Sequence, residues 1–139
     1  MSELKPQLGD FYWQDPFLLE SQLTEDDRML RDAAAQFAKK ELQPSIVEVY
    51  REAHVQPDLF KKMGQAGLLG STIPEEYGGI GASYSAYGLI AREIERVDSG
   101  YRSMMSVQSS LVIYPIHAYG NEQQRQKYLP ELCAGDLIV

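Results

Sequence analysis

The chain has 139 residues, 44% of them hydrophobic and 24% charged, and its 13 basic against 20 acidic side chains give a formal charge of −7. This composition is typical of one globular domain and excludes an intrinsically disordered chain. The acidic balance argues against nucleic-acid binding, because that needs Lys and Arg to neutralise phosphates. No apolar run approaches the roughly 20 residues of a bilayer span. The first 20 residues carry more acids than bases, so we expect neither a secretory signal nor a mitochondrial presequence.

Residues 1–22 are predicted to form an N-terminal arm. Apolar side chains flank Asp15 and Pro16 in this segment: Phe11, Tyr12, Trp13, Phe17, Leu18 and Leu19. The acid and the proline interrupt any regular period. We therefore expect the arm to dock on a core through these side chains rather than to form one.

The first strong helix is predicted to begin at Thr24, because three acids follow it in the turn where the helix dipole is positive. Apolar residues at steps of three and four predict its inward face: Leu30, Ala33, Ala34, Phe37 and Ala38. Pro44 then stops or kinks this helix.

Two shorter helices are predicted next, one from Ser45 to about Ala53 and one from about Asp58 to Gly67. The first of them has three side chains predicted to point inward: Ile46, Val49 and Tyr50. Residues 67–82 contain six glycines and prolines and are therefore predicted to be a loop.

The second half of the chain also has helical periods. One helix is predicted from about Ser83 to Asp98, with Leu89, Ile90, Ile94 and Val97 buried. Residues 100–119 are apolar on most sides, which predicts a buried helix. A capping-box pattern at 121–124 predicts a last helix as far as residue 135, with a kink or local break at residue 130. No segment alternates with a period of two, so the sequence predicts an all-α bundle of about five or six helices.

A polar seam crosses the apolar segment 100–119. Arg102 and Ser106 are four residues apart, and Ser103 and Ser106 three apart, so all three share one helix face. The guanidinium could bind an anion bidentately, with Glu95 seven residues earlier orienting it. Alternatively, the serines only permit close helix packing, Arg102 reaches solvent, and Glu95 is a solvated surface acid. The spacing alone favours this structural interpretation.

No other pattern predicts a catalytic, cofactor or metal site. His54 and His117 stand alone without metal-ligand spacing, and Cys133 is predicted to be a small residue near a helix end rather than a nucleophile. The glycines at 78, 79 and 81 match neither phosphate-binding motif with a Gly-rich loop.

Several motifs resemble those of acyl-CoA dehydrogenases. PEEYGG at 74–79 resembles a turn shared across that family. WQDP at 13–16, EIERVDSGYRSMMSVQSSLV at 93–112 and YGNEQQRQKYLP at 119–130 are similar to the glutaryl-CoA dehydrogenases within it. The resemblance covers about residues 11–137. It implies an N-terminal helical domain at 23–136, and at 137–139 the beginning of a middle β-domain.

This resemblance implies an FAD-dependent oxidoreductase that dehydrogenates glutaryl-CoA between Cα and Cβ, usually with decarboxylation to crotonyl-CoA. Arg102 matches the arginine that binds the distal carboxylate, Ser103 and Ser106 match neighbouring substrate contacts, and Glu95 matches an acid networked with the arginine. The family also implies an electron-transfer flavoprotein as acceptor, a homotetramer and a role in lysine and tryptophan degradation. We expect the bacterial cytoplasm, or the mitochondrial matrix for a processed eukaryotic form.

The resemblance also implies what these 139 residues lack. In the family, the flavin-contacting loop belongs to the middle β-domain and the catalytic glutamate to a C-terminal domain, both beyond the position that Val139 occupies. We therefore expect a fragment that neither holds FAD nor turns over substrate. Two alternatives stay open: a non-catalytic helical module, and a dehydrogenase of monocarboxylic acyl-CoA. Arg102 argues against the latter, because a buried arginine beside an alkyl chain would be unpaired.

Overall fold

The computed structural model describes residue 11 and residues 13–139, and this part of the chain contains helices and turns but no strand. The all-α prediction is therefore confirmed. The elements in chain order are η1 (Leu19–Gln22), α1 (Glu25–Phe37), η2 (Ala38–Leu42), α2 (Ile46–Glu52), α3 (Leu59–Gln65), η3 (Glu75–Tyr77), α4 (Tyr84–Glu95), α5 (Ser99–Ser106), η4 (Val107–Ile113), α6 (Tyr114–Tyr119) and α7 (Glu122–Ala134).

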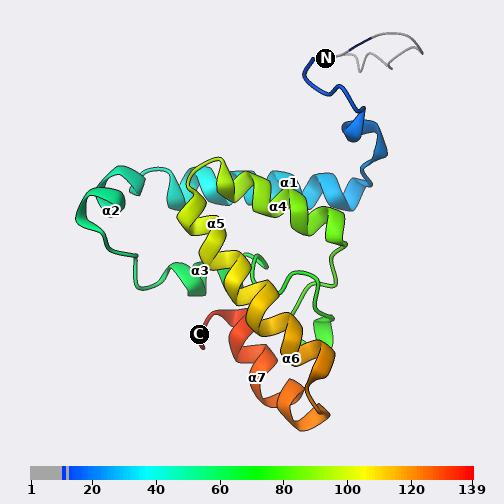
Figure 1. Ribbon diagram of the computed structural model, residues 1–139, viewed down its shortest axis with the longest axis vertical. Helices are drawn as coiled ribbons and strands as arrows, with labels where there is room; N and C mark the ends of the chain where they lie inside the picture. The colour runs from blue at the N-terminus through cyan, green and yellow to red at the C-terminus, as the bar shows by residue number, and fades with distance from the viewer. Residues whose placement is uncertain (1–10, 12) are drawn as a thin grey trace.

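The helices form two parts joined by one long element. Figure 1 shows α1 and α4 side by side at one end, and α7 with α6 at the other. The continuous run of α5, η4 and α6, which we call the central rod, leads from the first part to the second. The loop between α3 and α4 and the helix α3 itself pack beside α7. The central rod therefore contributes side chains to both parts.

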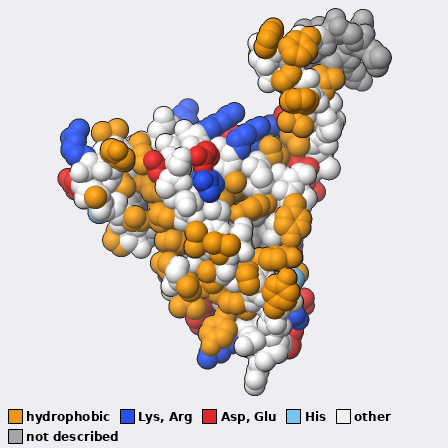
Figure 2. Space-filling model, viewed as in Figure 1, with side chains coloured by type: hydrophobic (Ala, Val, Ile, Leu, Met, Phe, Trp, Pro, Cys, Tyr) orange, Lys and Arg blue, Asp and Glu red, His pale blue; other side chains and the backbone are white. Residues whose placement is uncertain are grey.

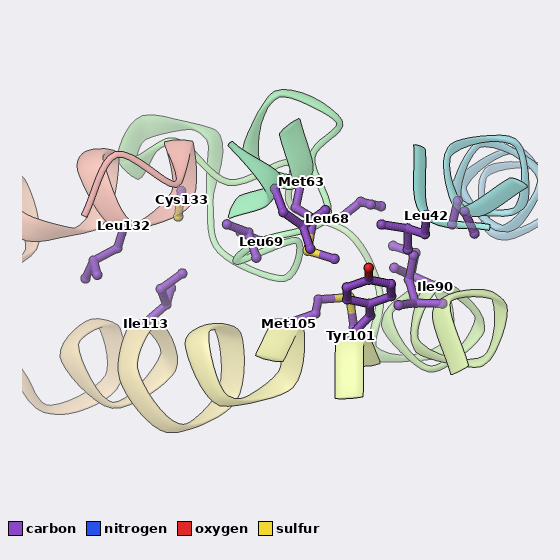
Figure 3. Close-up of a cluster of buried hydrophobic side chains, with 14 of the residues drawn as sticks. Leu42, Met63, Leu68, Leu69, Ile90, Tyr101, Met105, Ile113, Leu132 and Cys133 are labelled. Atoms are coloured by element: carbon purple, nitrogen blue, oxygen red, sulfur yellow. The ribbon is translucent and has the colours of Figure 1, made fainter. Parts of the chain in front are cut away.

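The apolar core follows the inner side of the central rod. Figure 3 shows Met105 and Ile113 of the rod facing side chains from the 67–82 loop and α7, with Ile113 near Leu132 and Cys133. These four side chains are at most 1% exposed. Burying each side chain of the Leu, Ile or Met type contributes roughly 1.5–3 kcal/mol, so this contact line fixes the rod against α7.

Two π-helical turns interrupt the α-helical geometry, and the sequence did not predict them. The turn η2 ends two residues before Pro44, and η4 ends two residues before Pro115. A proline lacks the N–H that would bond the carbonyl four residues earlier, and its ring collides with that carbonyl. The wider i to i−5 bonding of Gln43 to Ala38 and of Tyr114 to Ser109 accommodates this.

Most predicted helix limits agree with the structure, with local exceptions. Thr24 caps α1 in a capping box with Asp27, as the acidic first turn suggested. Ala33 is exposed because it lies just outside the buried stripe of α1. Tyr50 is 83% exposed, since α2 projects away from the rest of the molecule (Figure 1). The predicted break at Pro130 is wrong, because α7 continues through it to Ala134.

Most apolar side chains in the described part of the N-terminal arm are exposed. Phe11, Trp13, Phe17 and Leu19 are each more than half exposed, and Figure 1 shows the arm leading away from α1. The expectation for Tyr12 lies outside the described residues. Polar contacts hold the arm instead, since Arg31 donates to Glu20 at 2.6 Å. The expected docking through the aromatic side chains is therefore absent among the described residues.

Glycines allow two helices to approach closely at one crossing. Gly64 of α3 faces the end of α7, and a Cβ placed on it would overlap the carbonyl oxygen of Ala134 and lie 2.7 Å from that of Cys133. By contrast, a Cβ on Gly88 of α4 would meet no atom within 4 Å. The close contact between α3 and α7 therefore requires glycine at position 64.

Asp27 links α1 to α4 and gives a testable dependence on pH. Its carboxylate accepts from the Thr24 backbone N–H at 3.1 Å and from the Ser83 hydroxyl at 2.7 Å. These bonds, that of Ser83 foremost, hold the pKa of Asp27 below its ordinary value. A lowered folded-state pKa adds stability that is complete above the unfolded-state pKa and is lost as the pH falls through the folded-state value.

We expect Asp27→Asn to reduce the stability of the chain at about pH 7, and the difference from wild type to shrink near pH 3. Urea unfolding followed by circular dichroism at both pH values measures it. Asp26→Asn, an exposed change in the same helical turn, is the control. An equal difference for Asp27→Asn at both pH values would contradict a role for the ionised carboxylate.

Candidate functional site

The predicted site lies at the corner where α4 ends and α5 begins. The Asp98 side chain caps α5 by accepting from the backbone N–H groups of Gly100 at 2.7 Å and Tyr101 at 3.2 Å. A Cβ on Gly100 would lie 2.7 Å from the capping Asp98 oxygen. Asp98 and Gly100 therefore favour a sharp turn, which folds the end of α4 back toward the first turn of α5.

The corner brings Glu95 and Arg102 into contact. The Arg102 Nε–H donates to Glu95 Oε2 at 2.6 Å, and its Nη1 donates to the Ser106 hydroxyl oxygen at 3.3 Å. The Arg102 side chain is 37% exposed and that of Glu95 43% exposed. The structure thus brings together three of the four predicted site residues, half-buried at the surface.

Ser103 contributes to this arrangement through its backbone. The Ser106 hydroxyl donates to the Ser103 carbonyl at 3.0 Å, so that carbonyl fixes the hydroxyl which accepts from Arg102. The Ser103 side chain itself is on the exposed side of α5. The roles of these four residues in binding substrate remain predictions.

Glu95 is held ionised by two donors. The Ser99 hydroxyl donates to Glu95 Oε1 at 2.6 Å, while Oε2 accepts from Arg102. The Ser99 hydrogen bond, followed by that of Arg102, lowers the pKa of Glu95 from its ordinary value. A carboxylate with both oxygens engaged keeps a defined orientation, and so does the guanidinium bonded to it.

The ion pair between Arg102 and Glu95 bears on the kind of substrate that Arg102 permits. Arg102 was expected to be buried and, beside a plain alkyl chain, to be left as an unpaired charge. It is instead partly exposed and paired with Glu95. Its position therefore does not by itself exclude a substrate that ends in a methyl group.

The rod that begins at this corner also has an exposed apolar side. Residues 100–119 were expected to be buried on all sides, but the rod exposes one side, where Leu111 is 69% and Tyr114 40% exposed. Figure 2 shows hydrophobic side chains over the central rod on this face. The other side of the rod is buried at Tyr101, Met105 and Ile113. One helix thus carries a core-facing side and an exposed apolar side.

Some polar side chains that the sequence left unassigned are buried and structural. Gln108 donates to the carbonyl of Leu137 at 2.8 Å and accepts from the Val139 N–H at 3.4 Å, so it holds the segment after α7. The Ser109 hydroxyl accepts from the Gly70 N–H at 3.1 Å. Glu93 is 4% exposed and pairs with the flanking Arg92 and Arg96. Only a tertiary contact distinguishes such residues from exposed polar ones, so spacing could not find them.

Other potential chemistries have no support in the part of the chain that the structure describes. No group of three or more His, Cys, Asp or Glu side chains there could hold a metal ion. Burial raises the pKa of the Cys133 thiol to about 11, so it stays protonated, as expected for a structural residue. None of the described helices is both long and apolar enough to cross a bilayer.

The resemblance implies FAD, so the groups along the central rod can be compared with what a flavin dinucleotide needs. A dinucleotide needs cations or a row of backbone N–H donors for its diphosphate. Along the central rod the only Lys or Arg is Arg102, and Glu95 already occupies its Nε edge. The exposed apolar side of the rod could contact a ring but supplies no diphosphate site. The central rod alone therefore does not supply a complete FAD site, and FAD binding by the chain stays a matter for experiment.

Comparison with known proteins gives consistent matches. The model of the family "Acyl-CoA dehydrogenase, N-terminal domain" matches residues 24–136. An acyl-CoA dehydrogenase of Bacillus subtilis is 38% identical over 114 residues, or 82% of this chain and 30% of that protein. The mitochondrial short-chain specific acyl-CoA dehydrogenase of Mus musculus is 38% identical over 117 residues, or 84% of this chain and 28% of that protein.

A solved structure agrees with these matches. The crystal structure of a glutaryl-CoA dehydrogenase from Mycobacterium smegmatis in complex with FADH2 has a TM-score of 0.83 and 37% identity, covering 88% of this chain and 31% of that chain. The chain thus spans 30% or less of the two curated relatives. Because the family match includes nearly all of the described helices, the chain belongs to the acyl-CoA dehydrogenase N-terminal domain family.

Proposed function

We propose that this chain is the N-terminal, substrate-recognising part of an FAD-dependent dehydrogenase that oxidises glutaryl-CoA between Cα and Cβ, a reaction that the family usually couples to decarboxylation to crotonyl-CoA. The observation that carries the proposal is the guanidinium of Arg102, held by Glu95 at 2.6 Å and by Ser106 at 3.3 Å on a rod that also exposes apolar side chains. Such a site suits an acyl chain that ends in a carboxylate.

The arrangement leaves part of the guanidinium for a ligand. Glu95 accepts from Nε, so the end of the fork formed by Nη1 and Nη2 is the part that can bind a second carboxylate bidentately. Ser106 accepts from Nη1 and donates to the Ser103 carbonyl, so it can donate to a bound carboxylate only by turning its hydroxyl away from that carbonyl. Further along the rod, the exposed side chain of Leu111 offers apolar surface to a ligand that extends in that direction.

A second candidate, a dehydrogenase of short monocarboxylic acyl-CoA, has two observations in its favour. The mouse short-chain relative is as similar in sequence as the glutaryl-CoA dehydrogenase structure. Arg102 has its charge partner in Glu95 without any substrate. The discriminating experiment compares kcat/KM for glutaryl-CoA and butyryl-CoA in a complete enzyme that carries this chain. A preference for butyryl-CoA would reject the dicarboxylic proposal.

The partners that we propose follow from the same family. The acyl-CoA is the substrate, an electron-transfer flavoprotein accepts the electrons, and the complete protein is a homotetramer in lysine and tryptophan degradation. We propose the bacterial cytoplasm as its location, or the mitochondrial matrix for a eukaryotic form. The division into an arm at 1–22, a helical domain at 23–136 and a β-domain beginning at 137–139 also stays a prediction.

The 139 residues on their own are expected to bind no stoichiometric FAD and to show no dehydrogenase activity. The central rod supplies no diphosphate site, and the resemblance assigns the flavin-contacting loop and the catalytic base to other domains. Loss of a general base alone typically lowers a rate by roughly 10²–10⁴-fold. An absorbance spectrum after gel filtration and an assay with an artificial electron acceptor check this. A flavin band that stays with the protein would contradict the expectation, whereas a colourless, self-associating chain would favour a non-catalytic module.

A further inference from the structure

Ser99 is the one member of the corner network to which the family resemblance gave no role. It is the first residue of α5, and its hydroxyl donates to Glu95 Oε1 at 2.6 Å. The other oxygen of Glu95 accepts from Arg102 Nε at 2.6 Å. A continuous line of hydrogen bonds therefore leads from Ser99 through Glu95 and Arg102 to Ser106.

This line exists only because the helix breaks at the corner. In one uninterrupted helix, residues seven apart are separated by about 10.5 Å along the axis. The turn capped by Asp98 shortens this separation until Glu95 and Arg102 form a hydrogen bond. The same turn places Ser99 next to the carboxylate that ends α4. The backbone of the corner thus arranges a donor on each side of Glu95.

The two donors have different consequences for Glu95. A carboxylate bonded only to Arg102 could rotate about its last torsion and move together with the long arginine side chain. Ser99 has a short side chain fixed by the first turn of α5, so its hydrogen bond ties the carboxylate to the backbone. A half-exposed arginine loses much conformational entropy when it binds a ligand. A carboxylate partner that is itself held in place reduces this loss, because it orders the arginine before the ligand arrives.

We propose that Ser99 is a positioning residue that sets the dicarboxylate preference of this site by fixing Glu95, which in turn orients the Arg102 fork. This inference rests on the proposed function, because it assumes that Arg102 binds the distal carboxylate. Ser99 acts through Glu95 and touches no reacting atom. Its loss is therefore expected to raise KM for a dicarboxylic acyl-CoA while kcat stays near the wild-type value.

The test uses three variants of a complete enzyme that carries this chain. Ser99→Ala is expected to raise KM for glutaryl-CoA roughly three- to tenfold, the size of one ordinary hydrogen bond lost at a partly exposed site, and to leave KM for butyryl-CoA unchanged. Ser99→Thr retains the hydroxyl and should restore KM for glutaryl-CoA. Ser85→Ala replaces an exposed serine on α4. It is the control and should change neither KM for glutaryl-CoA nor KM for butyryl-CoA.

A second measurement separates this inference from the proposed function. In the NMR spectrum of the 139-residue chain, the Arg102 Nε–H should exchange with solvent faster in Ser99→Ala than in wild type. Unchanged exchange together with unchanged KM would overturn the positioning role alone. Faster exchange with an unchanged KM ratio, while Arg102→Ala still loses the preference, would also overturn it. If Arg102→Ala itself keeps the preference for glutaryl-CoA, the proposed function fails.

Discussion

Replacing Arg102 by alanine in a complete enzyme that carries this chain is expected to lower kcat/KM for glutaryl-CoA by about 30-fold to several thousand-fold. The distal carboxylate of this substrate loses water when it enters the site, and an unpaired buried carboxylate is very costly. Arg102 offsets that cost with charge-assisted hydrogen bonds, and Ser106 stands beside it. Truncating one partner of such a pair costs about 2–5 kcal/mol, and 1.4 kcal/mol corresponds to tenfold.

The matched control for Arg102→Ala is a second substrate, butyryl-CoA, assayed with the same variant. Butyryl-CoA has no distal carboxylate, so its kcat/KM should change far less in the same variant. Arg102→Lys should restore only part of the activity with glutaryl-CoA, because an ammonium group does not reproduce the planar fork. Equal losses for both substrates would show that Arg102 is structural and holds the corner only through Glu95.

Gly64→Ala is expected to lower the free energy of unfolding by about 3 kcal/mol, the upper part of the usual range for overpacking. The new methyl group would overlap the backbone at the end of α7 rather than the mobile end of a side chain. A backbone cannot move aside by changing rotamer, so α3 and α7 must separate and expose their contact. Chemical denaturation of the 139-residue chain measures this difference.

Gly88→Ala provides a control of opposite sign. Gly88 also lies inside a helix, but its new methyl group would meet open space. Alanine favours the helix over glycine, so this variant should gain about 0.5–1 kcal/mol. If both changes altered stability in the same direction, helix propensity rather than the α3–α7 contact would control position 64.

The sequence predicted the helices because their signals are local. Thr24 with its three following acids, and Asn121 with Gln124, form capping boxes in the structure at the predicted places. The errors occurred where contacts with distant parts of the chain determine which side of a helix is buried. Tyr50 fits the helical period of α2, yet it is 83% exposed, and the exposed side of the central rod also carries apolar side chains such as Leu111. Periodicity alone cannot tell which apolar side meets the core.

The sequence predicted which residues belong to the candidate site, but not how they are arranged. Arg102 and Ser106 are one helical turn apart, so their hydrogen bond follows from spacing. The contact between Arg102 and Glu95 depends on the angle of the corner, which no local pattern specifies. Spacing also gave Ser99 no role in the site, although it stands at the first position of α5. Its contact with Glu95 becomes visible once the corner is folded.

At the corner, side chains that pack in the core and side chains that form the candidate site alternate at neighbouring positions of the chain. Ile94 and Tyr101 are buried in the core, while their immediate neighbours Glu95 and Arg102 face outward as a pair. Exchanging the outward pair therefore leaves the hydrophobic framework intact. A domain built in this way can evolve a preference for another acyl chain through a few surface positions, without having to evolve a new fold first.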